Sequence, residues 1–207
     1  MQVDCETTST ADLYKIIISS VVPRPIAWIS TLSKKGVRNL APFSFFNAFS
    51  VSPPVVGIGI GSKIGVDEAG NPAMVDKDTF KNIKDTGEFV VNIVSKSLAE
   101  QMNQSSGNYP PEEDEFVKTG LTPGHSVKVN APRVQECKIS MECNLYQTIP
   151  LGTSNLVLGQ IALIHINDDS ILKSGEVDPL LLEPVGRLGG ISYCSFDEVF
   201  EIPRPVV

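Results

Sequence analysis

Short stretches in which hydrophobic and polar residues alternate dominate this chain. In residues 25–32 the side chains fall on two faces with the two-residue period of a β-strand. The same pattern predicts further strands at about residues 37–50, 55–60, 88–94, 133–147 and 154–166. Pro42 is expected to break or bulge the strand at residues 37–50. In the strand at residues 55–60, Gly57 and Gly59 have no side chains and leave room for another group to approach closely.

Three short segments have the pattern of helices instead. The first begins at Thr10, and the other two span residues 78–86 and 97–103. Asp78 or Thr79 can cap the second helix, and Gly87 can end it in a left-handed conformation. Between the strands and this helix, the glycine-rich, acidic stretch from Gly61 to Lys77 is predicted to be a loop over a site or at its edge.

Many strands with few helices between them favour a mainly β fold. A parallel sheet would need a helix after nearly every strand, so a single antiparallel barrel is expected. Neither an internal repeat nor a linker divides the chain, and all 207 residues are predicted to form one domain.

The composition narrows the possible partners. The chain is 42% hydrophobic and 20% charged, as in average soluble proteins, and its net charge is −7. A negative charge of this size disfavours nucleic acid and anionic membranes as partners. No apolar run has the length of a membrane helix, and we expect a cytoplasmic protein. The cysteines and histidines lack the spacing of a metal site, so no metal is expected.

The first candidate for chemistry is a phosphate site. Hydroxyls and ammonium groups are the donors that a phosphate monoester requires. Backbone N–H groups at the start of the 78–86 helix would add to them. The candidate side chains are Ser30, Thr31, Ser62, Lys63, Lys77 and Thr79. The alternative is that Asp78 and Thr79 only cap the helix and that the lysines are solvated.

The second candidate is a slot for a flat ring with one apolar and one polar edge. Main-chain groups of Ala41, Pro42, Phe43 and Ser44 would face the polar edge. Phe46 or Trp28 is expected to cover one face of the ring, and Asn47 is expected to add a side-chain hydrogen-bond donor. The alternative is an ordinary barrel core, which some of these phenylalanines must fill in any case because successive side chains alternate.

The other motifs argue against most enzyme classes. There is no nucleophile elbow, phosphate-binding loop of NTPases, HExxH or dinucleotide fingerprint, so a hydrolase or kinase is not expected. His165 lies in an apolar run, where a hydrogen-bonded structural histidine is more common than a catalyst. No catalytic residue is assigned.

Five motifs, in order, resemble the flavin reductase-like FMN-binding split-barrel family, in its flavoredoxin-like branch. The motifs are Pro23-Arg24-Pro25-Ile26-Ala27-Trp28-Ile29-Ser30-Thr31, Asn39-Leu40-Ala41-Pro42-Phe43-Ser44-Phe45-Phe46-Asn47, Lys77-Asp78-Thr79 with Asn82, Gly87-Glu88-Phe89-Val90-Val91-Asn92, and Gly186-Arg187-Leu188-Gly189-Gly190 with Tyr193. They extend over about residues 12 to 195.

The resemblance implies a six-stranded antiparallel split β-barrel of Greek-key type with a few short peripheral helices. It also implies a homodimer with FMN near the interface. Residues 41–47, from Ala41 to Asn47, would contact the ring. The phosphate would be contacted by Ser30, Thr31, Ser62 and the Lys77-Asp78-Thr79 segment. Asn82 belongs to the same phosphate motif, and Arg187 and Tyr193 are expected to complete the pocket.

The resemblance also implies a function. Bound FMN would pass electrons to a flavin, a small molecule or a redox partner protein. One feature departs from two-component flavin reductases, which often carry Gly-Asp-His near the nicotinamide site, where this chain has Gly152-Thr153-Ser154. Use of NAD(P)H as electron donor is therefore left open. The alternatives are an FMN storage or carrier module without turnover and, less favoured, a relative of pyridoxamine phosphate oxidases.

Overall fold

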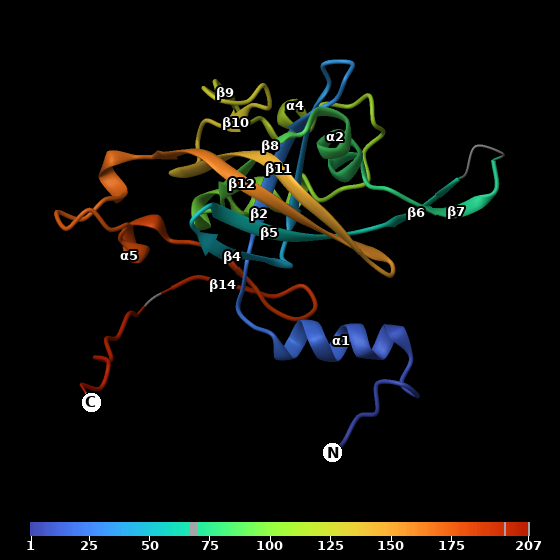
Figure 1. Ribbon diagram of the computed structural model, residues 1–207, viewed down its shortest axis with the longest axis horizontal. Helices are drawn as coiled ribbons and strands as arrows, with labels where there is room; N and C mark the ends of the chain where they lie inside the picture. The colour runs from blue at the N-terminus through green and yellow to red at the C-terminus, as the bar shows by residue number, and fades with distance from the viewer. Residues whose placement is uncertain (67–69, 197, 207) are drawn as a thin grey trace.

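The computed structural model describes residues 1–66, 70–196 and 198–206. Within these residues, seven strands form one antiparallel sheet in the order β3–β2–β8–β11–β12–β5–β4 (Figure 1). Their bounds are β2 (Ala27–Leu32), β3 (Arg38–Phe43), β4 (Phe46–Val51), β5 (Pro54–Gly61), β8 (Glu88–Ile93), β11 (Ile139–Leu151) and β12 (Ser154–Ile166).

The sheet closes on itself at one bent strand. β3 and β4 stand at opposite edges of the sheet, although only Ser44 and Phe45 separate them in the sequence. Phe45 extends the pairing of β4 with β5, because its carbonyl accepts a hydrogen bond from the N–H of Gly59 at 2.7 Å. Counted with β3 and β4 as one strand, the sheet is the predicted six-stranded split barrel, and the expected break near Pro42 falls at residues 44–45.

Shorter elements surround the barrel. The helices are α1 (Thr10–Ser20), α2 (Asp78–Thr86), η1 (Lys96–Leu98), α3 (Ala99–Gln104), α4 (Glu115–Thr119), η2 (Asp168–Ser170) and α5 (Pro179–Leu182). The minor strands are β1 (Arg24–Pro25), β6 (Lys63–Val66), β7 (Pro72–Val75), β9 (Pro123–Gly124), β10 (Arg133–Val134), β13 (Gly186–Arg187) and β14 (Tyr193–Cys194). β1, β13 and β14 pair in one small sheet, and α1 lies apart from the barrel with no buried residue (Figure 1).

The two faces of β2 separate two hydrophobic clusters. Ala27 and Ile29 belong to the cluster inside the barrel, around Phe89. Trp28 belongs to a second cluster, between the outer face of the sheet and the segment that follows β8. The expected close approach at the glycines of β5 is confirmed, since a Cβ on Gly57 would lie 2.5 Å from the ring of Phe49.

The prediction of a loop from Gly61 to Lys77 was wrong for most of its length. β6 and β7 pair in register as an antiparallel ribbon that extends away from the barrel (Figure 1). Short strands with glycine and polar residues have too little apolar alternation to be recognised. Residues 67–69, which belonged to the same prediction, lie outside the described residues.

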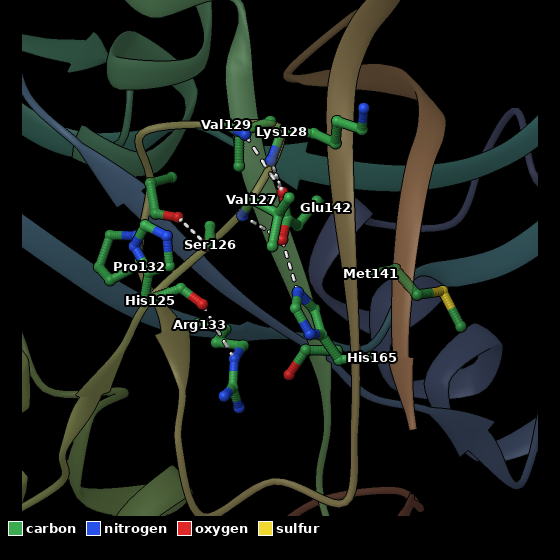
Figure 2. Close-up of polar contacts among 12 residues, drawn as sticks. His125, Ser126, Val127, Lys128, Val129, Pro132, Arg133, Met141, Glu142 and His165 are labelled. Atoms are coloured by element: carbon green, nitrogen blue, oxygen red, sulfur yellow. Dashed lines mark hydrogen bonds and ion pairs between the residues drawn. The ribbon is translucent and has the colours of Figure 1, made fainter. Parts of the chain in front are cut away.

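A buried carboxylate fastens the long segment between α4 and β11 to the barrel. Glu142 of β11 is fully buried and accepts hydrogen bonds from the N–H groups of Val127, Lys128 and Val129 and from Nε2 of His165 (Figure 2). Burial by itself would raise the pKa of Glu142, but these four hydrogen bonds hold that pKa below its ordinary value. His165 therefore has the structural role that its apolar surroundings indicated.

Candidate cofactor-binding groove

Two adjoining cavities form one groove along β3. The larger, of about 1190 Å³, lies between α1, β3 and the β13–β14 turn. The smaller, of about 130 Å³, lies between β3, β6, the start of α2 and the loop after α3. Both are lined by Pro42, Phe43 and Ser106. We call the whole the β3 groove, its smaller part the lysine end and its larger part the arginine end.

Two lysines, two carboxylates (Asp78 and Glu115) and a helix N-terminus meet at the lysine end. Nζ of Lys63 lies 2.6 Å from Oδ2 of Asp78, and the ammonium of Lys77 lies 5.5 Å from the centre of the Phe43 ring. Burial lowers the pKa of Lys77, and the nearby charge of Lys63 lowers it further. An anion between these ammonium groups would reverse both effects.

The expected cap of α2 was wrong in detail. Lys77, and neither Asp78 nor Thr79, occupies the position before the first helical residue, and its side chain makes no capping hydrogen bond. The C-terminal end of α2 has the predicted left-handed conformation, with Gly87 at φ 74°. The start of α2 therefore presents backbone donors and the positive end of the helix dipole to the lysine end.

A buried polar network fixes α2 beneath the groove. Oδ1 of Asn39 accepts hydrogen bonds from the hydroxyls of Thr79, at 2.7 Å, and Thr31, at 3.3 Å. The amide of Asn82 donates to Thr31 at 3.0 Å. All four side chains are at least nine-tenths buried. Thr31, Thr79 and Asn82 thus lie together, but their side chains bond to one another and to β3, and of the three only Thr79 lines the groove.

Glu115 completes this network from the other side. Its carboxylate accepts hydrogen bonds from Nδ2 of Asn39, at 2.8 Å, and from the N–H of Leu40, at 3.1 Å. Burial raises the pKa of Glu115; the hydrogen bonds, including that from Asn39, oppose this rise, and the charge of Asp78 adds to it. The first residue of α4 thus holds β3 in place where it borders the groove.

The main chain of β3 and the bend after it form the floor of the groove. Ala41 lines the lysine end, Ser44 lines the arginine end, and Pro42 and Phe43 line both. Residues 41–44 of the segment expected to contact the ring, which was Ala41 to Asn47, therefore lie in the middle of the groove.

Aromatic and cationic side chains from the end of the chain line the arginine end. The guanidinium of Arg187 lies over the ring of Tyr193, 4.4 Å from its centre. Arg24 lies beside them and is 6% exposed. Both Arg187 and Tyr193 were expected here, whereas Arg24 was quoted in a motif and not assigned to the site.

Two predicted contact residues lie on the face of β2 that points away from Thr31. The indole N–H of Trp28 donates to Oγ of Ser105 at 2.8 Å. The hydroxyl of Ser30 donates to the carbonyl of Pro132 at 2.5 Å and accepts from the amide of Asn92 at 3.0 Å. Both side chains are fully buried and line neither end of the groove.

Three more of the predicted residues also lie outside the groove lining. Phe46 packs against the cluster inside the barrel. Asn47 is exposed on the edge strand β4, where its side chain bonds to the next N–H of its own strand. Ser62 lies just before β6, and its N–H donates to the carbonyl of Thr153.

Several groove residues had no signal in the sequence. The loop after α3, residues 105–109, lines the lysine end, and one face of α1 lines the arginine end. Asn39 and Glu115 are hub residues of the buried network, yet an asparagine in a strand and a glutamate at a helix start are common in any protein. Arg24 alone had a signal, because an arginine between two prolines is unusual.

The described part of the chain has neither a cluster of metal-ligating side chains nor a helix suited to cross a membrane. Nowhere in it do three side chains of the metal-ligating types His, Cys, Asp and Glu gather. Among its helices, none combines the length and the apolar character that crossing a bilayer demands.

The structure is thus a split barrel whose β3 groove has two lysines and a helix start at one end and two arginines at the other. The comparisons show which family has this fold. Residues 18–183 match the model of the flavin reductase like domain, and the chain belongs to that family. An uncharacterised protein of Aquifex aeolicus is 42% identical over 193 residues, which is 93% of this chain and 94% of that one.

Solved structures with the same fold are named as redox proteins. Nitrilotriacetate monooxygenase component B from Bacillus cereus is 33% identical with a TM-score of 0.90, over 98% of each chain. The 2-nitrobenzoate 2-nitroreductase of Pseudomonas fluorescens is 29% identical with a TM-score of 0.85, over 99% of this chain and 96% of that chain. Flavoredoxin of Desulfovibrio vulgaris, at 20% identity and a TM-score of 0.74 over 98% of this chain and 97% of that one, shows the fold alone.

The raised pKa of Glu115 gives the first prediction. The folded chain keeps a proton on Glu115 that the unfolded chain has already released, so the free energy of unfolding falls as the pH rises from the ordinary glutamate pKa through the raised one. Glu115→Gln removes this titration. The free energy of unfolding of the native chain minus that of the variant should therefore be largest in acid and decline toward neutral pH.

Urea unfolding of both proteins between about pH 4 and pH 8 measures this difference. A difference that stays constant over the range would contradict the burial of an ionisable Glu115.

Proposed function

We propose that the chain is an FMN-binding oxidoreductase whose β3 groove holds the cofactor. The observation that carries the proposal is the lysine end, where Lys77, Lys63 with its partner Asp78, and the start of α2 converge beside the ring of Phe43. The names of two neighbours, a monooxygenase component and a nitroreductase, support a redox function.

The donors at the lysine end fit a phosphate monoester. The ammonium groups of Lys63 and Lys77 would supply the charge, and the N–H groups at the start of α2 would supply directional hydrogen bonds. Thr79 lies directly below and would support this end through Asn39, because its hydroxyl already donates there. Ser30, the other hydroxyl first assigned to the phosphate, is left out of the proposed site.

The floor of the groove fits a planar ring. The main chain from Ala41 to Ser44 would offer N–H and C=O groups to its polar edge, and Phe43 would lie beside the phosphate as well as the ring. Bound FMN would accept a pair of electrons from a donor and release them to an acceptor. The side chains of the groove would then bind, orient and shield it, and none of them is assigned to acid or base catalysis.

Exposed apolar side chains support the expected homodimer. Phe49 and Val51 on β4 and Ile64 on the β6–β7 ribbon are 60%, 93% and 83% exposed. A second copy of the chain would cover exposed apolar side chains of this kind. Light scattering during gel filtration should give twice the mass of the chain, and a monomer mass would contradict this expectation.

A carrier without turnover is the second candidate. It is favoured by the turn between β11 and β12, where Gly152-Thr153-Ser154 replaces the Gly-Asp-His of two-component reductases. Rapid mixing of the FMN-loaded protein with NADH or NADPH in the absence of oxygen separates the two. A reductase should bleach the flavin absorption with at least one donor, whereas a carrier would leave it unchanged with both.

The lysine end gives the prediction that tests the phosphate assignment. Lys63→Met and Lys77→Met should each weaken FMN binding about tenfold or more, because a charge-assisted hydrogen bond to the phosphate is lost. Riboflavin has the same ring without the phosphate, so its affinity should change little in either variant. Fluorescence titration of the native chain and both variants with FMN and riboflavin measures these dissociation constants.

Lys81→Met is the matched control, since Lys81 is an exposed lysine of α2 that does not line the groove. An equal loss of FMN affinity in this control would point to overall charge. Unchanged FMN affinity in both Lys63→Met and Lys77→Met would exclude the lysine end as the phosphate site.

A further inference from the structure

We propose that the arginine end of the β3 groove binds a small planar carboxylate, which would be the substrate class of the bound cofactor. This inference rests on the proposed function, because it places the substrate beside the segment that would hold the flavin ring. Three observations carry it: a pair of opposed arginines, a lining without acidic residues, and the size of the cavity.

Two arginines face each other across paired strands. Arg24 of β1 and Arg187 of β13 are direct register partners in the antiparallel pair. Like charges in this arrangement repel each other and destabilise the pairing. Burial lowers the pKa of Arg24, and the charge of Arg187 lowers it further. An anion bound beside them would relieve this repulsion.

No carboxylate of the described chain neutralises the pair. Each ion pair found in residues 1–66, 70–196 and 198–206 involves other cations than Arg24 and Arg187. The described side chains that line the arginine end include no aspartate or glutamate, and the third cation among them, Lys15, is paired with Asp12 at 3.1 Å. In a chain with a net charge of −7, a cavity with this lining is a specific site of positive potential.

The two arginines have different parts in the site. Arg24 donates to the carbonyls of Ile18, Val21 and Leu188, so its hydrogen bonds hold the chain and its charge contributes the field. Arg187 donates to one carbonyl, that of Gly190, and its plane is fixed against Tyr193. A guanidinium has five N–H donors in a fork that matches a carboxylate, so Arg187 is the group that would contact the ligand.

The remaining walls select a flat, partly apolar body. Tyr14, Phe43 and Tyr193 contribute aromatic surface, and Ile26 and Met102 contribute apolar surface. The volume of about 1190 Å³ exceeds the roughly 300–1,000 Å³ of a typical site for one ligand. The cavity therefore has room for one end of the cofactor and for a second planar molecule with its carboxylate toward Arg187.

Benzoate is the probe that tests the proposal, and benzamide is its neutral control. The FMN-loaded protein is first desalted to show that flavin is retained, and each probe is then titrated while the flavin absorption is followed. Benzoate should perturb the flavin spectrum and bind at least tenfold more tightly than benzamide. Arg187→Met should weaken benzoate at least tenfold and leave the affinity for benzamide within about twofold, and it should still retain FMN after desalting because the phosphate is assigned to the lysine end.

Two further variants make the result specific. Arg187→Lys keeps the charge and loses the fork, and it should give an intermediate affinity for benzoate. Arg133→Met removes an arginine of β10 that lies outside the groove, and it should leave all affinities unchanged. Unfolding midpoints of the variants show whether a loss of binding reflects a loss of folding.

The proposal is overturned by equal affinities for benzoate and benzamide, or by benzoate affinity that is unchanged in Arg187→Met. It is also overturned if Arg187→Met loses FMN, which would assign the arginines to the cofactor's phosphate. The same holds if Arg187→Met weakens the binding of NADH or NADPH and not that of benzoate. If the native chain does not retain FMN, the proposed function fails separately. In that case, equilibrium dialysis measures the affinity of benzoate for the cofactor-free native and Arg187→Met proteins. Equal affinities for the two proteins would overturn this proposal.

Discussion

The arrangement of the groove depends on one buried amide, that of Asn39. Its oxygen accepts hydrogen bonds from a hydroxyl of β2 and a hydroxyl of α2, and its nitrogen donates to the carboxylate at the start of α4. A buried amide costs free energy unless its donors and acceptors are paired, so these three elements have one favourable arrangement around it. This arrangement sets where α2 begins, and with it the positions of Lys77 and of the first backbone donors of the helix.

The electrostatics of the groove follow from the same frame. Helix α2 brings a dipole end and Lys77 to one end of β3, and β6 brings Lys63. The pairing of β1 with β13 brings two arginines to the other end. In an acidic protein the β3 groove thus has arginines without an ion pair in the described chain at one end, two lysines beside Asp78 and Glu115 at the other, and apolar surface along Pro42 and Phe43. Such a groove suits a ligand with an anionic tail and a flat head, with a second anion beside the head.

Local sequence was sufficient for the elements but not for the side-chain partners. The helix at residues 78–86 and its left-handed end at Gly87 were predictable, because spacing and glycine are local signals. The alternation in β2 separated Ser30 from Thr31 but did not tell which face lies under the groove. That choice is made by contacts far along the chain, such as the bond from Ser30 to Pro132, 102 residues away. The ribbon of β6 and β7, the role of Glu115 and the opposition of Arg24 to Arg187 also arise only when distant segments meet.

The central claim is that this chain holds one flavin in the β3 groove. The most direct test is the visible absorption spectrum of the purified protein after it has been mixed with excess FMN and desalted. The account predicts a retained flavin spectrum equivalent to one FMN per chain. A colourless protein would contradict it, and would mean that the two lysines and the start of α2 form a cationic surface without the affinity for a cofactor.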